Sequence, residues 1–257
     1  MSIFLLRKYK KSAIIKHMNF QNKHAVITGG SNGIGRCIAE TFLREGAAVT
    51  IIDIDNRKHD DVQFFHGDIA DKSVIEAFVD SINRPVDYFI NNACIGRGGL
   101  LSNCSYEDFE YVQRVGVTAP YYLTSLLLQK NLFTENAAIV NISSTRANQS
   151  QPDTEAYSAA KGGINALTHA MAVSLAGKVR VNAISPAWIG TSANVEHSEQ
   201  DMRQHLSGRV GTPADIAELV LFLCSDKAGF INGENITVDG GMSKLMIYHG
   251  DCGWKLT

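Results

Sequence analysis

The stretch VITGGSNGIGR, residues 26–36, decides the fold, because it places four glycines directly after a short apolar run. Glycine is entropically costly inside regular structure, so this cluster indicates a place where the backbone must be bare. The segment HAVITGG, residues 24–30, favours a buried strand, and Ile34, Ile38 and Phe42 recur behind it at helical spacing. A strand, a glycine-rich turn and a helix in this order are typical of a cradle for a phosphate group.

Length and composition are those of an ordinary globular chain. It has 257 residues, 45% hydrophobic and 19% charged, which suits one large α/β domain with a full core. The net charge of −2 predicts no general attraction to nucleic acid or to an anionic membrane. The five cysteines show no metal-like spacing, and without secretory features they indicate reduced thiols in the cytoplasm.

The first residues differ in composition from the rest of the chain. Residues 1–18 hold five Lys and Arg and no acidic residue. Their longest apolar block, residues 3–6, is too short for a signal-peptide core or a membrane span. We expect a poorly ordered basic extension here, with targeting or binding to an anionic surface as the alternative. Residues 19–257 are expected to form a single dinucleotide-binding and catalytic domain.

Short β-branched or aromatic runs alternate with longer helical patterns along the rest of the chain. Strands are predicted at HAVITGG (24–30), AVTIID (48–53), VQFFHGD (62–68), VDYFINNA (86–93), AAIVNISS (137–144), VRVNAISP (179–186) and NITVDGG (235–241). Helices are predicted at 34–46, 72–82, 106–131, 156–175 and 215–224. This alternation predicts an α/β fold with a parallel sheet covered on both faces. Ligands of such sheets bind beyond the carboxyl ends of the strands.

Polar side chains follow the second, third and fourth predicted strands. Asp53 ends the second strand, where an acid accepts hydrogen bonds from the adenosine ribose hydroxyls and repels a 2′-phosphate. NAD is therefore favoured over NADP. Asp68 is placed to accept from an adenine amino group, and Asn91 to hold neighbouring backbone. Turn formation alone is the alternative for both residues.

Three further residues suggest acid–base chemistry at the same edge of the sheet. Tyr157 and Lys161 are four residues apart at the start of a predicted helix, so their side chains share one face. A nearby ammonium stabilises a phenolate and makes a phenol a better acid–base group near neutrality. Ser144 follows the fifth strand, where its hydroxyl can bind a substrate oxygen while Tyr157 exchanges the proton.

With these motifs the chain resembles the short-chain dehydrogenase/reductase family over residues 19–246. The matching segments are TGGSNGIG (28–35), Asp53, GDI (67–69), NNA (91–93), NISS (141–144), YSAAK (157–161), VRVNAISP (179–186), RVGTPADIA (209–217) and NITVDGG (235–241). The resemblance implies a doubly wound Rossmann fold of about seven parallel strands, in a homodimer or homotetramer. It also implies hydride transfer between a nicotinamide cofactor and the carbonyl or alcohol carbon of a small molecule.

The family's functional residues carry over to this chain by position. Tyr157 is implied as proton donor or acceptor, Lys161 as the residue that tunes Tyr157 and binds the nicotinamide ribose, and Ser144 as the group that orients the reacting oxygen. Ile189 and Thr191 are implied beside the nicotinamide carboxamide. The cofactor-binding set is Gly29, Ser31, Asn32, Gly33, Ile34, Gly35, Asp53, Asp68, Ile69, Asn91, Ala93, Tyr157, Lys161, Pro186, Ile189 and Thr191.

The chain departs from the family pattern at three positions. Gly116 stands where the family usually has an asparagine, which is credited with kinking the long helix and holding a water beside the lysine. Glycine keeps the carbonyl and tolerates irregular backbone, but the proton relay is open to question. Cys94 and Ala187 replace usual glycines, and Cys94 is interpreted as a small buried hydrophobe.

Three functions remain open at this point. The leading one is an NAD-dependent oxidoreductase acting on a small alcohol or ketone. A 3-oxoacyl-thioester reductase is the narrower alternative, which Asp53 disfavours because such reductases usually use NADPH. An NAD-binding regulator or scaffold with weakened catalysis is the alternative of another class, motivated by Gly116 and Cys94. Residues 192–208 are expected to cover the substrate, with His197 and His205 as surface polar residues rather than metal ligands.

Overall fold

The computed structural model describes residues 20–57, 61–192, 195–246 and 248, so the predicted extension at 1–18 lies outside the described residues. The strands are β1 (His24–Thr28), β2 (Ala48–Asp53), β3 (Gln63–His66), β4 (Val86–Asn91), β5 (Phe133–Ile142), β6 (Val179–Pro186) and β7 (Asn235–Val238). They form one parallel sheet in the order β3-β2-β1-β4-β5-β6-β7. This topology confirms the doubly wound fold that strand–helix alternation predicts.

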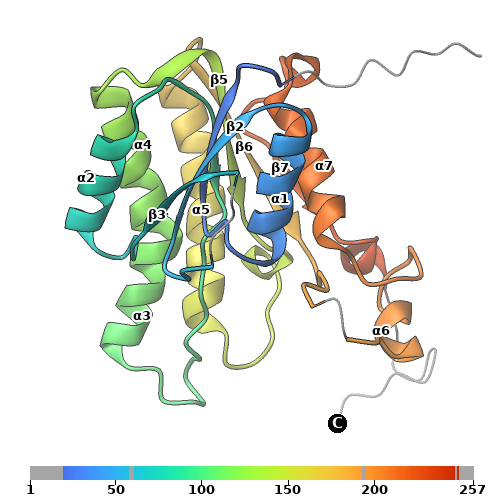
Figure 1. Ribbon diagram of the computed structural model, residues 1–257. Helices are drawn as coiled ribbons and strands as arrows, with labels where there is room; N and C mark the ends of the chain where they lie inside the picture. Colours follow the sequence, from blue (N-terminus) through green and yellow to red (C-terminus); the bar gives the residue numbers. More distant parts are fainter. Residues whose placement is uncertain (1–19, 58–60, 193–194, 247, 249–257) are drawn as a thin grey trace, which may run out of the picture.

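Helices cover both faces of the sheet (Figure 1). They are α1 (Gly33–Arg44), α2 (Lys72–Ser81), α3 (Tyr106–Gln113), α4 (Ala119–Gln129), α5 (Glu155–Ser174), α6 (Glu199–Arg203) and α7 (Pro213–Cys224). Side chains alternate along β1: Ala25 and Ile27 face the core shared with α1 and α7. Val26 faces the second core, which α2, α4 and α5 complete. Every residue of β1 is buried, as expected for a central parallel strand.

The topology also fixes the place of the ligand site. β1 pairs with β2 on one side and with β4 on the other, so the chain winds in opposite directions from β1. This reversal creates the crevice in which doubly wound sheets bind their ligands. The loops that follow β1, β4 and β5 lie with α6 at one edge of the sheet, the lower edge in Figure 1.

The predicted helical region at 106–131 contains an irregularity that the sequence pattern did not show. One turn, Arg114–Thr118, is a π-helix between α3 and α4, and Gly116 lies at its centre. Such turns are rare inside α-helices and are frequently found at functional sites. The short helix α6 was also not predicted, although Ser198 and Asp201 form a capping box at its start.

Candidate active site

The glycine-rich turn brings bare backbone together at the start of α1. Gly29 and Gly33 have φ values of +68° and +51°, which glycine adopts at little cost. A Cβ built on Gly35 would lie 2.1 Å from the Gly29 carbonyl oxygen, so a side chain has no room there. Asn32 is the N-cap of α1, and its side chain does not bond the first helical N–H groups. Those donors therefore stay available to a phosphate, which is the fit that a dinucleotide requires.

Asn92 fastens this turn to the end of β4. Its amide nitrogen donates to the carbonyl oxygens of Thr28 and Gly29 at 3.1 and 2.7 Å. Asn91 lies instead in the sheet interior, where its amide donates to the Asn141 side chain at 2.8 Å. The NNA motif pointed to this region, but it could not say which asparagine faces the turn. The cofactor role of Asn91 stays a prediction, and Asn92 is a residue that sequence reasoning missed.

Asp53 lies at the end of β2, where the sequence placed it. Its two carboxylate oxygens accept the backbone N–H groups of Ser31 and Asp55 at 2.8 and 2.9 Å. These bonds hold the carboxylate beside the glycine-rich turn, in a pocket of about 650 Å³. The pocket also takes in Gly33 and Thr191, so it runs along the start of α1.

Two residues beyond β2 complete this rim, and the sequence analysis did not single them out. Asp55 accepts from the Asn32 amide at 2.7 Å and from the Arg57 guanidinium at 2.8 Å. Hydrogen bonds from Arg57 and Asn32 lower the pKa of Asp55 to about 2. Arg57 is thereby a cation at the rim of the same pocket as Asp53, and it is paired with the Asp55 carboxylate. Its only sequence signal is its place four residues after Asp53.

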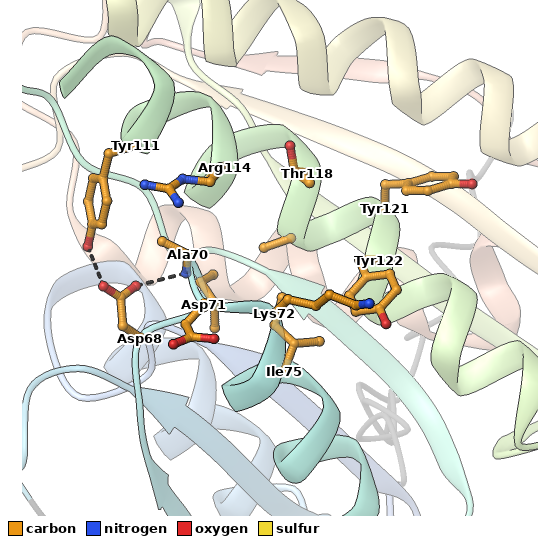
Figure 2. Close-up of a pocket in the computed structure, with 12 residues that line it drawn as sticks. Asp68, Ala70, Asp71, Lys72, Ile75, Tyr111, Arg114, Thr118, Tyr121 and Tyr122 are labelled. Atoms are coloured by element: carbon orange, nitrogen blue, oxygen red, sulfur yellow. Dashed lines mark hydrogen bonds between the residues drawn. The ribbon is translucent and has the colours of Figure 1, made fainter. Parts of the chain in front are cut away.

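Asp68 and Ile69 follow β3 and line the same pocket, as does Ala93 after β4. Asp68 accepts the Tyr111 hydroxyl at 2.8 Å and the Ala70 N–H at 2.8 Å. Tyr111 and Asp68 also line a second pocket of about 670 Å³ between α2 and α4, and Figure 2 shows the tyrosine reaching the carboxylate there. Burial and the Asp68 carboxylate raise the pKa of Tyr111, so this hydroxyl stays a donor.

Two of the predicted reaction residues, Lys161 and Ser144, are placed at the end of β5, and Tyr157 lies near the lysine. Lys161 is 4% exposed, and its Nζ donates to the Ile142 carbonyl at 2.7 Å. The same Nζ lies 5.4 Å from the centroid of the Tyr157 ring. Ser144 follows β5 two residues after Ile142, and its Oγ accepts the Arg146 N–H at 3.2 Å. Among the described residues, none forms a hydrogen bond with the Tyr157 hydroxyl.

Gly116 packs against α5, the helix that carries Tyr157 and Lys161. A Cβ built on Gly116 would lie 2.8 Å from the Ala160 Cβ and 3.7 Å from the Cys94 Sγ. Ala160 precedes Lys161 on α5, so the turn packs directly behind the lysine. The absent side chain is what allows this close approach. Cys94, which stands where the family usually has a glycine, lies at the same contact. It also lines the pocket that contains Asp53.

We predict that Gly116→Ala disturbs this contact. The added methyl has to push α5 away or shift the π-turn, and such overpacking costs about 1–3 kcal/mol. The melting temperature and kcat should both fall, and kcat by about tenfold because Lys161 moves with Ala160. Thermal unfolding and steady-state kinetics measure these effects. The double variant Gly116→Ala/Ala160→Gly should recover most of the lost kcat. An unchanged kcat in the single variant would contradict the prediction.

The segment after β6 returns to the glycine-rich turn. β6 ends at Pro186, and Ile189 forms a parallel bridge with Gly211. A Cβ on Gly33 would lie 3.1 Å from the Thr191 Cγ2, which places Thr191 against the turn. Their roles at a cofactor, like those of Ser31, Ile34 and the other implied residues, stay predictions.

The two histidines of residues 192–208, the segment expected to cover the substrate, have different surroundings. His197 packs edge-on against the Trp188 ring, with centroids 5.1 Å apart. His205 is 3% exposed, so its prediction as a surface residue is wrong. The reason is its packing against the tight turn at Gly240, where a Cβ would lie 3.1 Å from the His205 Cβ.

In the part of the chain that the structure describes, no group of three His, Cys, Asp or Glu side chains could hold a metal ion. No helix within the same residues is long and apolar enough to cross a membrane.

Comparison with known proteins agrees with this geometry. A model of the family described as Enoyl-(Acyl carrier protein) reductase matches residues 29–243. An uncharacterized oxidoreductase of Thermotoga maritima is 42% identical over 252 residues, covering 89% of this chain and 98% of the relative. The solved structure of an apo SCOR enzyme from Clostridium thermocellum is 45% identical with a TM-score of 0.84, covering 92% of this chain and 99% of its own. A 3-ketoacyl-(acyl-carrier-protein) reductase from Brucella melitensis, complexed with NADH, is 30% identical with a TM-score of 0.77, covering 88% and 100%.

The family match spans most of the chain, including the glycine-rich turn and the Ser144, Tyr157 and Lys161 positions. The match also covers nearly the whole length of the Thermotoga maritima oxidoreductase and of the Clostridium thermocellum enzyme. The chain therefore belongs to the short-chain dehydrogenase/reductase family, whose members are oxidoreductases that bind nicotinamide cofactors.

Proposed function

We propose that the chain is an NAD-dependent oxidoreductase that interconverts a small alcohol and the corresponding ketone. The observation that carries the proposal is the buried Lys161 ammonium, which lies 5.4 Å from the Tyr157 ring centroid. A bound nicotinamide supplies or accepts the hydride. The chain's own residues bind the substrate, orient it and move the proton.

Tyr157 is the general acid/base in this proposal. Its hydroxyl has no hydrogen-bond partner among the described residues, so it is available to a substrate oxygen. Lys161 presents its positive charge to the phenol ring, with Nζ 5.4 Å from the ring centroid. The Ser144 hydroxyl holds the same substrate oxygen from the end of β5. The Ile142 carbonyl fixes the lysine in place through its 2.7 Å bond to Nζ.

The cofactor preference is a prediction of its own. Asp53 presents a carboxylate at the rim of the pocket, where it favours a ribose with free hydroxyls and repels a 2′-phosphate. Fluorescence titration should therefore show NADH bound more tightly than NADPH, by about tenfold or more. Asp53→Asn should narrow this difference by weakening the repulsion. Tighter binding of NADPH by the unmodified protein would contradict the assignment, and it would draw attention to Arg57.

A substrate panel on the preferred cofactor tests the reaction itself. Small secondary alcohols, their ketones and a 3-oxoacyl thioester should be assayed side by side by the absorbance of NADH. Turnover of alcohols or ketones supports the proposal. Exclusive turnover of the thioester would favour the second candidate, a 3-oxoacyl-thioester reductase, which the name of the Brucella melitensis neighbour supports.

A third candidate, an NAD-binding regulator or scaffold, rests on Gly116 and Cys94. The retained Ser144, Tyr157 and Lys161 argue against it, because a protein that only binds NAD does not require a buried lysine next to a tyrosine ring. Cofactor binding without turnover on the whole panel would favour it.

We further propose a homodimer or homotetramer in the cytoplasm. The resemblance to the family supports the assembly. The cysteines described, Cys37, Cys94, Cys104 and Cys224, are all free, which suits a reducing compartment.

A further inference from the structure

The loop that follows β4 is fastened to the start of α5 by two carboxylates. Asp153 Oδ1 accepts the backbone N–H groups of Leu101 and Ser102 at 2.8 and 2.9 Å. Glu155 Oε2 accepts the backbone N–H of Leu100 at 3.1 Å. We call this set of two carboxylates and three amides the carboxylate clasp. It joins two loops that are more than fifty residues apart in the chain.

The loop is shaped to receive these carboxylates. A Cβ built on Gly99 would lie 1.7 Å from Glu155 Oε2, so only glycine lets this carboxylate approach. Gly98 has a φ of +76°, and a Cβ there would lie 2.1 Å from the Ser102 Oγ. Asp153 itself has a φ of +66°, an uncommon conformation for a residue with a side chain. Hydrogen bonds from Ser102 hold the pKa of Asp153 below its ordinary value, so the carboxylate is ionised at neutral pH.

The clasped loop forms a wall beside the catalytic tyrosine. A Cβ on Gly96 would lie 3.9 Å from the Tyr157 Cδ2, so the loop passes along the ring. Just before it, Cys94 and Ile95 line the cofactor pocket. The clasp carboxylate of Asp153 belongs to the segment that leads directly into Tyr157. The clasp therefore holds together two segments, the loop and the approach to α5, that both adjoin the Tyr157 ring.

A second anchor holds the side of the loop that faces α3. Arg97 forms an ion pair with Asp108 at 2.6 Å, and its guanidinium lies 4.0 Å from the centroid of the Tyr111 ring. The clasp is therefore what fixes the other side, between Gly99 and Ser102. The side chains of Leu100 and Leu101 are 81% and 77% exposed, so their packing contributes little to holding the loop.

We propose that Asp153 and Glu155 are positioning residues for the reaction at Tyr157, because the clasp keeps one wall of the substrate site formed before substrate binds. The inference rests on the proposed function. Without the clasp, substrate binding has to order the loop, and this entropic cost lowers the apparent affinity. Neither carboxylate takes part in proton transfer, and neither contributes to the cradle at Gly29–Gly35.

The variants Asp153→Gly and Asp153→Asn test this proposal. Glycine removes the carboxylate while keeping the left-handed backbone without strain, and asparagine keeps an acceptor oxygen and tolerates the same φ. Asn136→Gly is the matched control, since Asn136 is exposed, has a φ of 61° and lies in the first half of β5, away from the site. Each protein is measured by hydrogen exchange of amides 100–102, by NADH titration, and by kinetics on the best substrate of the panel.

In Asp153→Gly, amides 101 and 102 should lose protection and KM should rise about tenfold, with kcat and the Kd of NADH within about twofold of the unmodified protein. Asp153→Asn should restore KM to within about twofold, and Asn136→Gly should change nothing. Faster exchange with an unchanged KM, unchanged exchange, or a weaker affinity for NADH would each overturn the inference. Absence of turnover in the unmodified protein would instead count against the proposed function.

Discussion

Replacing Tyr157 by phenylalanine should abolish turnover while leaving NADH binding nearly intact. The change removes the hydroxyl that we propose exchanges a proton with the substrate, and general acid–base catalysis of this kind contributes about 10²- to 10⁴-fold. The ring remains, so its packing along Gly96 and beneath the Lys161 ammonium is kept. We expect kcat to fall by about three orders of magnitude or more on the best substrate of the panel. Stopped-flow or steady-state absorbance of NADH measures the loss.

The control for this variant is Tyr106→Phe, which removes the same atom from an exposed tyrosine at the start of α3. It should leave kcat, KM and the Kd of NADH unchanged. Residual turnover of Tyr157→Phe above a tenth of the original rate would show that another group handles the proton. A large loss of NADH affinity would show that the hydroxyl serves the cofactor rather than the substrate.

The fold could be predicted from the sequence because its signals are local and repeated. Each strand is a short apolar run that carries side chains to both cores, as Ala25 and Val26 show in β1. A glycine-rich turn between strand and helix has few uses other than close approach to a ligand. Parallel strands bring their carboxyl ends to one edge, so Asp53 and Ser144 could be placed at the same edge without a structure.

The remaining features of the site depend on tertiary contacts that no periodicity records. At the π-turn, α5 approaches Gly116 so closely that a methyl group does not fit, which a helical pattern does not reveal. Asn91 and Asn92 are neighbours in sequence, but their side chains differ in direction at the end of β4. The Asn91 side chain lies within the sheet, and the Asn92 side chain reaches the glycine-rich turn. The carboxylate clasp joins the loop after β4 to the segment between β5 and α5, which are more than fifty residues apart in the sequence. Gly98 and Gly99 can be read from the sequence, but no sequence pattern connects their loop to Asp153.

The substitution Gly35→Ala should disrupt phosphate binding at the glycine-rich turn, because even a methyl group has no room there. The new Cβ would lie 2.1 Å from the Gly29 carbonyl oxygen and 2.4 Å from the Asn92 Nδ2. Both are part of the contact that folds the turn over the start of α1, so either the turn opens or the amide loses its 2.7 Å bond. The N–H groups then no longer converge on a phosphate. We expect the Kd for NADH, from fluorescence titration, to rise by about a hundredfold or more.

The matched control is Gly162→Ala on α5, where a Cβ meets no heavy atom within 4 Å. Alanine is favoured over glycine inside a helix by about 1 kcal/mol, so this variant should melt at a slightly higher temperature and bind NADH normally. Gly35→Ala should lower the melting temperature as well as the affinity, because overpacked backbone costs stability whether or not cofactor is present. An adenosine titration separates the two effects, because adenosine carries no phosphate and is expected to bind at the Asp53 end of the pocket. If Gly35→Ala keeps its affinity for adenosine and loses that for NADH, the turn acts on the phosphates. An NADH affinity equal to that of the unmodified protein would contradict the cradle, since no other described contact places backbone donors at the start of α1.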